Sequence, residues 1–153
     1  MDQSGHSTIV HEPDPEFPGW WTWDVADKTR FNPHALGRLI VRKESDDAVR
    51  LRLFTARQHA NLHDRVHGGV TLSLIDVALF VTSRILRGVN AAGSVTLDLS
   101  TQFISPGAIG EPLDAVTEVL RETGRLVFLR GKVEQDGNLI AAYSGAIRKP
   151  SRR

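Results

Sequence analysis

Residues 61–76 read Asn-Leu-His-Asp-Arg-Val-His-Gly-Gly-Val-Thr-Leu-Ser-Leu-Ile-Asp, and this stretch decides the fold. A polar loop runs into two glycines, which open an apolar run of seventeen residues from Val70 to Leu86. Such a run is longer than an ordinary strand, so it predicts a helix. Its apolar side chains point in nearly every direction around the axis, which predicts a helix buried on most sides by a larger element.

Asp76 is the carboxylate inside this apolar run. Its neighbours on a helical projection are Leu72, Ser73, Leu79 and Phe80, so no lysine or arginine lies three or four residues away to pair with it. Aspartate is rarely buried without a partner, which makes Asp76 a candidate functional group. A solvent-exposed helix face, or a bond to a backbone group elsewhere in the fold, would also explain it.

Gly68 and Gly69 give the helix start a second functional feature. Glycines lack a Cβ, so their amides approach a ligand closely, and free N–H groups at a helix N-terminus suit an oxyanion or a polarised carbonyl. A plain turn is the alternative interpretation of the pair.

The flanking segments predict strands. Alternating apolar residues predict a hairpin at about 38–43 and 48–57, and four further strands follow the helix, the last two joined by Asp136-Gly137-Asn138. Two strands, one helix and four strands predict an α+β domain over residues 35–149, an antiparallel sheet of about six strands wrapped around the helix. The sheet covers the helix from one side only, so the other side needs a partner.

Residues outside this domain are predicted to contribute less. Residues 1–34 form an extension whose first part, 1–19, is rich in proline and acidic residues and is expected to be mobile or loosely docked. Trp20, Trp21 and Trp23 follow, and packing on the core is favoured over a groove cover or a subunit interface. Residues 150–153 form a basic tail.

Asn61, the tripeptide His67-Gly68-Gly69 and Asp76 together resemble the motif of the hot-dog-fold acyl-CoA thioesterases of the phenylacetate-degradation, or PaaI-like, type. In that family an Asn lies six residues before the His and an Asp nine residues after it, and this chain has both spacings. The likeness covers about residues 35–149 and includes Gln-Phe-Ile-Ser-Pro at 102–106 and Gly-Arg-Leu-Val-Phe at 124–128.

The resemblance implies hydrolysis of an acyl-CoA thioester, with CoA as part of the substrate and no separate cofactor. The amide of Gly68, with or without that of Gly69, would polarise the thioester carbonyl, and Asn61 would hold the carbonyl or the water. Asp76 would act as general base or as a nucleophile that forms an anhydride, and the sequence leaves both open.

The spacing of these residues predicts a shared active site. Gly68 and Asp76 lie roughly 12 Å apart along one helix, so a single carbonyl cannot contact both in one chain. Two antiparallel helices across a twofold axis would bring them together, and the resemblance implies this homodimer, often doubled into a tetramer.

Further site residues follow from the same resemblance. Thr96 falls where many members carry a Ser or Thr that orients the water, although an ordinary strand threonine is the alternative. His67 is expected to shape the loop through a side-chain hydrogen bond rather than take a proton. Arg125 and Arg148 are candidates for the CoA phosphates, and the acyl pocket is expected to include Ser73, Leu79 and Phe80.

Composition narrows the remaining possibilities. The 153 residues predict one domain, and a net charge of +1 from 19 basic and 18 acidic residues calls for no nucleic acid or anionic membrane. The lack of cysteine excludes disulfides and thiolate metal sites. We expect no signal peptide and a cytoplasmic location by default, and the run broken by Asp76 and Arg84 is expected to be too short to span a bilayer.

Other interpretations are weaker. His59, His63 and His67 stand four apart, but the loop character around them disfavours a metal site. A hot-dog hydratase or dehydratase would carry a proline-rich segment around its His, which residues 66–69 lack. A non-catalytic acyl-CoA-binding hot-dog protein is the stronger alternative, although residues 1–34 show no pair of amphipathic helices for DNA binding.

Overall fold

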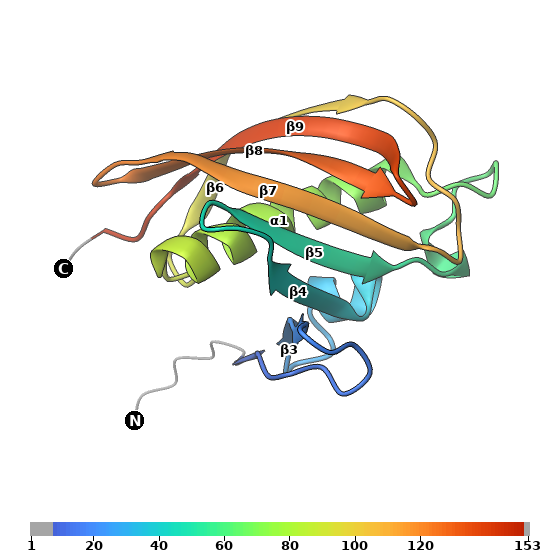
Figure 1. The fold of residues 1–153 in the computed structure, drawn as a ribbon, viewed down its shortest axis with the longest axis horizontal. Helices are drawn as coiled ribbons and strands as arrows, with labels where there is room; N and C mark the ends of the chain where they lie inside the picture. Colours follow the sequence, from blue (N-terminus) through green and yellow to red (C-terminus); the bar gives the residue numbers. More distant parts are fainter. Residues whose placement is uncertain (1–7, 152–153) are drawn as a thin grey trace.

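A curved antiparallel sheet lies over one long helix in the computed structural model of the chain, which describes residues 8–151 (Figure 1). The strand order of this sheet is β2-β4-β5-β7-β8-β9-β6. The predicted α+β architecture, with the sheet wrapped around a central helix, is confirmed.

The elements are as follows. The large sheet contains β2 (Trp21–Thr22), β4 (Leu39–Lys43), β5 (Ala48–Phe54), β6 (Val95–Phe103), β7 (Pro112–Glu122), β8 (Leu126–Gln135) and β9 (Asn138–Arg148). A two-stranded sheet contains β1 (Ile9–Val10) and β3 (Asp24–Val25), and the helical segments are η1 (Asn32–Leu36), η2 (Arg57–His59) and α1 (Gly68–Arg87). The hairpin and the four later strands match the prediction, and the extension supplies β2 as a seventh strand.

α1 is buried along one side and open along a stripe on the other. It ends at Gly88, whose φ of 64° suits the left-handed cap that glycine adopts easily. One row of side chains, spaced four residues apart along the helix, stays exposed or half-buried: Leu72, Asp76, Phe80 and Arg84. The residues that face the sheet are buried, among them Leu74, Ile75, Ala78 and Leu79.

The helix is longer than the apolar run suggests. Its 20 residues are long and apolar enough to cross a membrane by length and composition alone, so the expectation that it is too short is wrong. Half of its most apolar window is buried inside the protein, as the core helix of a wrapped fold requires.

A bulge in β6 changes which side chains face the helix. Strict alternation places Thr96 on the face opposite to Leu99, but the register shifts between Thr96 and Asp98. Thr96 therefore pairs with the buried Ile147 and Leu99 with Gly145, two positions apart on β9, so both face α1. Leu97, in the bulge, is 54% exposed.

The extension is docked on the sheet edge rather than loosely attached. β1 pairs with β3, β2 pairs with β4, and Asp14 is buried, so the prediction of a mobile or loosely docked tail is wrong for residues 8–19. Residues 1–7 lie outside the described range. Trp20 and Trp23 are buried, as the favoured packing role requires, whereas Trp21 is 42% exposed.

Arginines in β4 and β5, and Arg38 just before β4, hold this extension in place. Arg38 donates to both carboxylate oxygens of Asp14, at 2.9 and 2.8 Å, and its guanidinium lies over the ring of Phe17. The guanidinium groups of Arg42 and Arg52 lie over the Trp20 ring in the same way, each with its central carbon 4.6 Å from the ring centroid. Cation–π contacts of this kind stabilise most when partly desolvated, as they are here.

We expect Arg38→Met to loosen the extension, because the buried Asp14 carboxylate would lose its partner. All three tryptophans lie in the extension, so their fluorescence reports its docking. The variant should give a red-shifted emission at neutral pH while the far-ultraviolet circular dichroism of the sheet and helix stays unchanged. Lys43→Met, which removes an exposed ion pair to Asp46, is the control and should leave the emission unchanged.

Acid should act on the same contact. Hydrogen bonds from Arg38 hold the pKa of the Asp14 carboxyl below its ordinary value of 3.8. Because the folded pKa is depressed, the contact contributes fully above about pH 4 and is lost as the pH falls through the lowered value. The emission shift in wild type should therefore begin only below about pH 4; a shift centred on pH 5 or higher would contradict this assignment.

Candidate active site

Asn61 organises the loop that leads into α1. Its side-chain oxygen accepts hydrogen bonds from the backbone N–H groups of His63 and Arg65, at 2.9 and 3.1 Å. Its own N–H donates to the Arg65 carbonyl at 2.7 Å, and Asp64 adopts a left-handed conformation with φ of 56°. Asparagine and aspartate suit such turns, so the sequence folds here into a closed loop whose Asn61 amide NH₂ remains available as a donor.

His67 caps the helix. Its Nδ1 atom accepts the N–H of Gly69 at 2.8 Å, which is the side-chain hydrogen bond that the sequence predicts for this residue. The N–H of Gly68 has no acceptor within residues 8–151. Of the two glycine amides, the one at Gly68 is therefore free to bind a ligand, while the one at Gly69 is occupied.

A pocket of about 450 Å³ opens beside these groups. Its lining combines the loop, the helix start and the segment after β6, and comprises Asn61, His63, Arg65, Val66, Gly68, Thr71, Phe103, Ile104, Ser105, Pro106, Gly107 and Ile140. Its lining mixes polar and apolar side chains, as ligand sites commonly do. The predicted site residues omit Phe103, although a Cβ on Gly68 would lie only 3.5 Å from its ring.

Asp76 lies away from this pocket, on the open stripe of α1. It is half-buried, and the hydroxyl of Thr96 donates to its Oδ1 atom at 2.7 Å. It forms no ion pair within the described part of the chain. One carboxylate oxygen is thus fixed by Thr96, and the other remains free to accept a proton from a ligand or water.

The free Gly68 amide and the Asp76 carboxylate therefore do not meet within one chain. The free Gly68 amide and the pocket lie at the start of α1, and Asp76 lies eight residues later, roughly 12 Å along the axis. The pocket lining does not include Asp76.

The predicted acyl-pocket residues divide between the open stripe and the core. Phe80 is half-buried on the same row as Asp76, and Ser73 is half-buried with its hydroxyl donating to the Gly69 carbonyl at 2.7 Å. Leu79 is completely buried and packs against Gly145 of β9, where an added Cβ would lie 2.8 Å from it. The expectation that Leu79 lines an accessible pocket is wrong, because it faces the sheet.

Arg125 and Arg148 lie together at the end of the sheet nearest Thr96. Arg148 pairs with Leu126, the residue after Arg125, and with Val95, the residue before Thr96. Both arginines are exposed, and neither forms an ion pair within residues 8–151. The structure therefore brings these two predicted residues near Thr96 and leaves their charges available.

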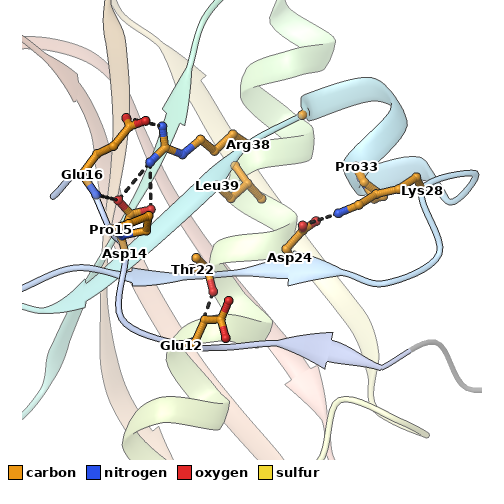
Figure 2. A pocket seen from close by; sticks show the side chains of 11 residues that line it. Glu12, Asp14, Pro15, Glu16, Thr22, Asp24, Lys28, Pro33, Arg38 and Leu39 are labelled. Atoms are coloured by element: carbon orange, nitrogen blue, oxygen red, sulfur yellow. Dashed lines mark hydrogen bonds and ion pairs between the residues drawn. The ribbon is translucent and has the colours of Figure 1, made fainter.

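A larger cavity of about 530 Å³ is lined by the extension and by Gly37, Arg38 and Leu39 at the start of β4 (Figure 2). Figure 2 shows the guanidinium of Arg38 directed at Asp14 and Glu16, and the Lys28 ammonium at Asp24. Arg38 and Lys28 thus pair with three of the four carboxylates in the lining, so the cavity belongs to the docking of the extension. Within residues 8–151, no group of three or more His, Cys, Asp or Glu side chains is placed to hold a metal ion.

Comparisons with known proteins agree with this geometry. A family model described as the thioesterase superfamily matches residues 63–142, just over half of the chain. Human acyl-coenzyme A thioesterase 13 is 27% identical over 105 residues, which make up 66% of this chain and 71% of the human protein.

Solved structures share the same fold. The phenylacetic acid degradation protein PaaI of Thermus thermophilus, solved as a mutant, is 25% identical with a TM-score of 0.65 and covers 76% of this chain and 96% of its own. A hypothetical thioesterase of Streptococcus pneumoniae, solved with coenzyme A, has a TM-score of 0.68 at 17% identity and covers 78% and 91% of the two chains. The predicted resemblance to PaaI-like hot-dog proteins is confirmed.

The two glycines at the helix start should respond differently to alanine. A Cβ on Gly68 meets Phe103 at an ordinary contact distance, so Gly68→Ala should raise the free energy of unfolding by up to about 1 kcal/mol through helix propensity. A Cβ on Gly69 would lie 3.0 Å from the His67 ring, so Gly69→Ala should disturb the cap and lose that gain. Urea unfolding measures both, and equal effects would contradict the assigned cap.

Proposed function

The chain belongs to the thioesterase superfamily, and from this membership we propose that it hydrolyses acyl-CoA thioesters at sites shared by two identical subunits. It is a thioester hydrolase of the hot-dog fold, as the sequence predicts. The observation that carries the proposal is the separation of a free helix-terminal amide at Gly68 from a Thr96-bound carboxylate at Asp76. The name of the human relative and the coenzyme A in the Streptococcus structure support acyl-CoA as the substrate.

An open helix stripe and an open sheet edge support the dimer. β6 ends the strand order, so its outer edge has no neighbour within the described chain. Exposed apolar side chains gather along this edge and the helix beside it: Leu72, Val95, Leu97, Phe103 and Ile104. A twofold partner would cover them and place its own Asp76 opposite the Gly68 amide, with Asn61 nearby. Assembly of two such dimers into a tetramer stays a prediction.

The chemistry follows from these positions. The thioester carbonyl oxygen accepts the Gly68 N–H and the Asn61 amide, which stabilise the negative charge that develops on it. Asp76 of the partner subunit removes a proton from water as the water oxygen bonds to the carbonyl carbon. The C–S bond then breaks, the proton held by Asp76 passes to the leaving sulfur, and the carboxylic acid and the CoA thiol are released. Thr96 of that partner holds the carboxylate in line, and its oxygen can also accept from the water.

Direct attack by Asp76 is the alternative: the carboxylate oxygen bonds to the carbonyl carbon, the C–S bond breaks to release the CoA thiolate, and water opens the resulting anhydride in a second step. In either route Arg125 and Arg148 are proposed to bind the CoA phosphates, because they are exposed, uncompensated and close to Thr96.

Substitution of the carboxylate tests the proposal. Asp76→Ala should lower kcat at least about a hundredfold on a panel of aryl and aliphatic acyl-CoAs, and Thr96→Val about tenfold. Thr101→Val is the matched control on the same strand, because the Thr101 hydroxyl is buried without a hydrogen bond, and it should keep wild-type kcat. Equal rates for Asp76→Ala and wild type would remove Asp76 from the mechanism. Saturable binding of acyl-CoA without turnover by wild type would favour a non-catalytic binding protein.

Mixed dimers test the shared site. Asp76→Ala and Asn61→Ala disable different halves, so a heterodimer of the two has one doubly damaged site and one intact site. After unfolding and refolding of an equal mixture, about a quarter of the wild-type activity should return, because half of the dimers are mixed and each has one intact site. Each variant refolded alone is the control. No recovery in a mixture that forms heterodimers would place the whole site in one chain.

A further inference from the structure

The His59 side chain is buried, and both of its ring nitrogens form hydrogen bonds. His59 directly precedes the loop that carries Asn61. Its side chain is 1% exposed. Nδ1 accepts the backbone N–H of Ala56 at 2.9 Å, and Nε2 donates to the carbonyl of Ala35 at 3.1 Å. Only the neutral ring with its proton on Nε2 satisfies both bonds, since Ala56 offers a donor and Ala35 an acceptor.

The backbone of His59 also closes the loop that carries Asn61. The N–H of His67 donates to the His59 carbonyl at 2.8 Å, and Ala60 pairs with Val66 inside that closure. Residues 60–66 are thus a loop with His59 and His67 at its base. Gly68, with the free amide, is the next residue after this base.

The ring connects that base to two other segments. Ala56 precedes η2, so the bond to Nδ1 fixes the turn in which His59 itself lies. Ala35 belongs to η1, the segment that leads from the N-terminal extension into β4, so the bond to Nε2 fixes the base of the loop against this connection. No other side chain within residues 8–151 is hydrogen-bonded to both η1 and η2, and an apolar residue at position 59 would leave both backbone groups unpaired.

We propose that His59 is a positioning residue for thioester hydrolysis, which holds Asn61 and the Gly68 amide at the distance that the developing oxyanion requires. This inference rests on the proposed function, because it assigns those two groups to the substrate carbonyl. His59 does not line the pocket, and both ring nitrogens are already engaged, so it neither touches the substrate nor binds a metal.

The rate of hydrolysis should depend steeply on the position of the groups that bind the carbonyl oxygen. A displacement of about 1 Å at a group that stabilises the transition state can cost about a hundredfold in rate. Because the carbonyl is a weaker acceptor before attack than the oxyanion is after it, such a displacement lowers kcat more than it raises KM. A role in stability alone would lower the melting temperature and leave kcat of the folded enzyme unchanged.

Three substitutions separate these roles. His59→Leu removes both bonds, His59→Asn keeps an acceptor near Ala56, and His59→Gln keeps a donor that reaches toward Ala35. Tyr143→Phe is the matched control, because it removes a buried hydrogen bond of 2.5 Å between Tyr143 and Thr117 in the sheet. It should cost comparable stability without contact to the loop.

We expect kcat to fall about tenfold to a hundredfold in His59→Leu with KM changed less than about threefold. His59→Asn and His59→Gln should each recover part of that loss. Tyr143→Phe should keep wild-type kcat at a temperature where it is fully folded. Hydrogen–deuterium exchange of residues 59–69 should rise in His59→Leu and stay unchanged in Tyr143→Phe.

Wild-type kcat in folded His59→Leu, or an equal loss in Tyr143→Phe, would overturn the positioning role. If His59→Leu fails to fold, the comparison of His59→Asn and His59→Gln with Tyr143→Phe decides in the same way. A wild-type enzyme inert toward every acyl-CoA would overturn the proposed function instead, and unchanged exchange in the His59 variants would overturn the positioning of the loop independently of any substrate.

Discussion

The structure depends on burying a helix that is apolar around most of its circumference with a sheet that reaches only part of it. β5, β7, β8 and β9 curve over α1 and cover Leu74, Ala78 and Leu79, which removes their surface from water. The row at 72, 76, 80 and 84 stays open because no strand within residues 8–151 extends past β6. Asp76 lies in this row, so the one carboxylate of the helix is placed where a partner can reach it.

At the start of the helix, the backbone N–H groups differ in whether they have a hydrogen-bond partner. A helix begins with N–H groups that have no partner inside it, and each must be bonded or left for a ligand. The Gly69 N–H donates to the His67 side chain, and the His67 N–H donates to the His59 carbonyl. The Gly68 N–H remains free. The free amide is held by its bonded neighbours, which is the preorganisation that stabilisation of an oxyanion requires.

The extension is attached mainly by charged and aromatic contacts at the sheet edge. Arg42 and Arg52 enclose Trp20, and Arg38 joins Asp14. β2 also covers the outer edge of β4, which reduces the backbone that would otherwise be open to pairing with another chain. η1 is then joined to the loop that carries Asn61 by the hydrogen bond between Ala35 and His59, so the extension and this loop form one connected structure.

The sequence by itself determined the α+β class, the helix, six of the seven strands and the motif of Asn61, Gly68 and Asp76, because apolar periodicity and motif spacing are local properties of the chain. Tertiary structure alone decided which way the side chains point. The β6 bulge turned Thr96 toward Asp76 against the alternation of its strand, and the position of β9 placed Leu79 in the core. The docking of residues 8–19 also depends on arginines later in the chain, such as Arg38. These outcomes follow from contacts between distant segments, which neither periodicity nor composition records.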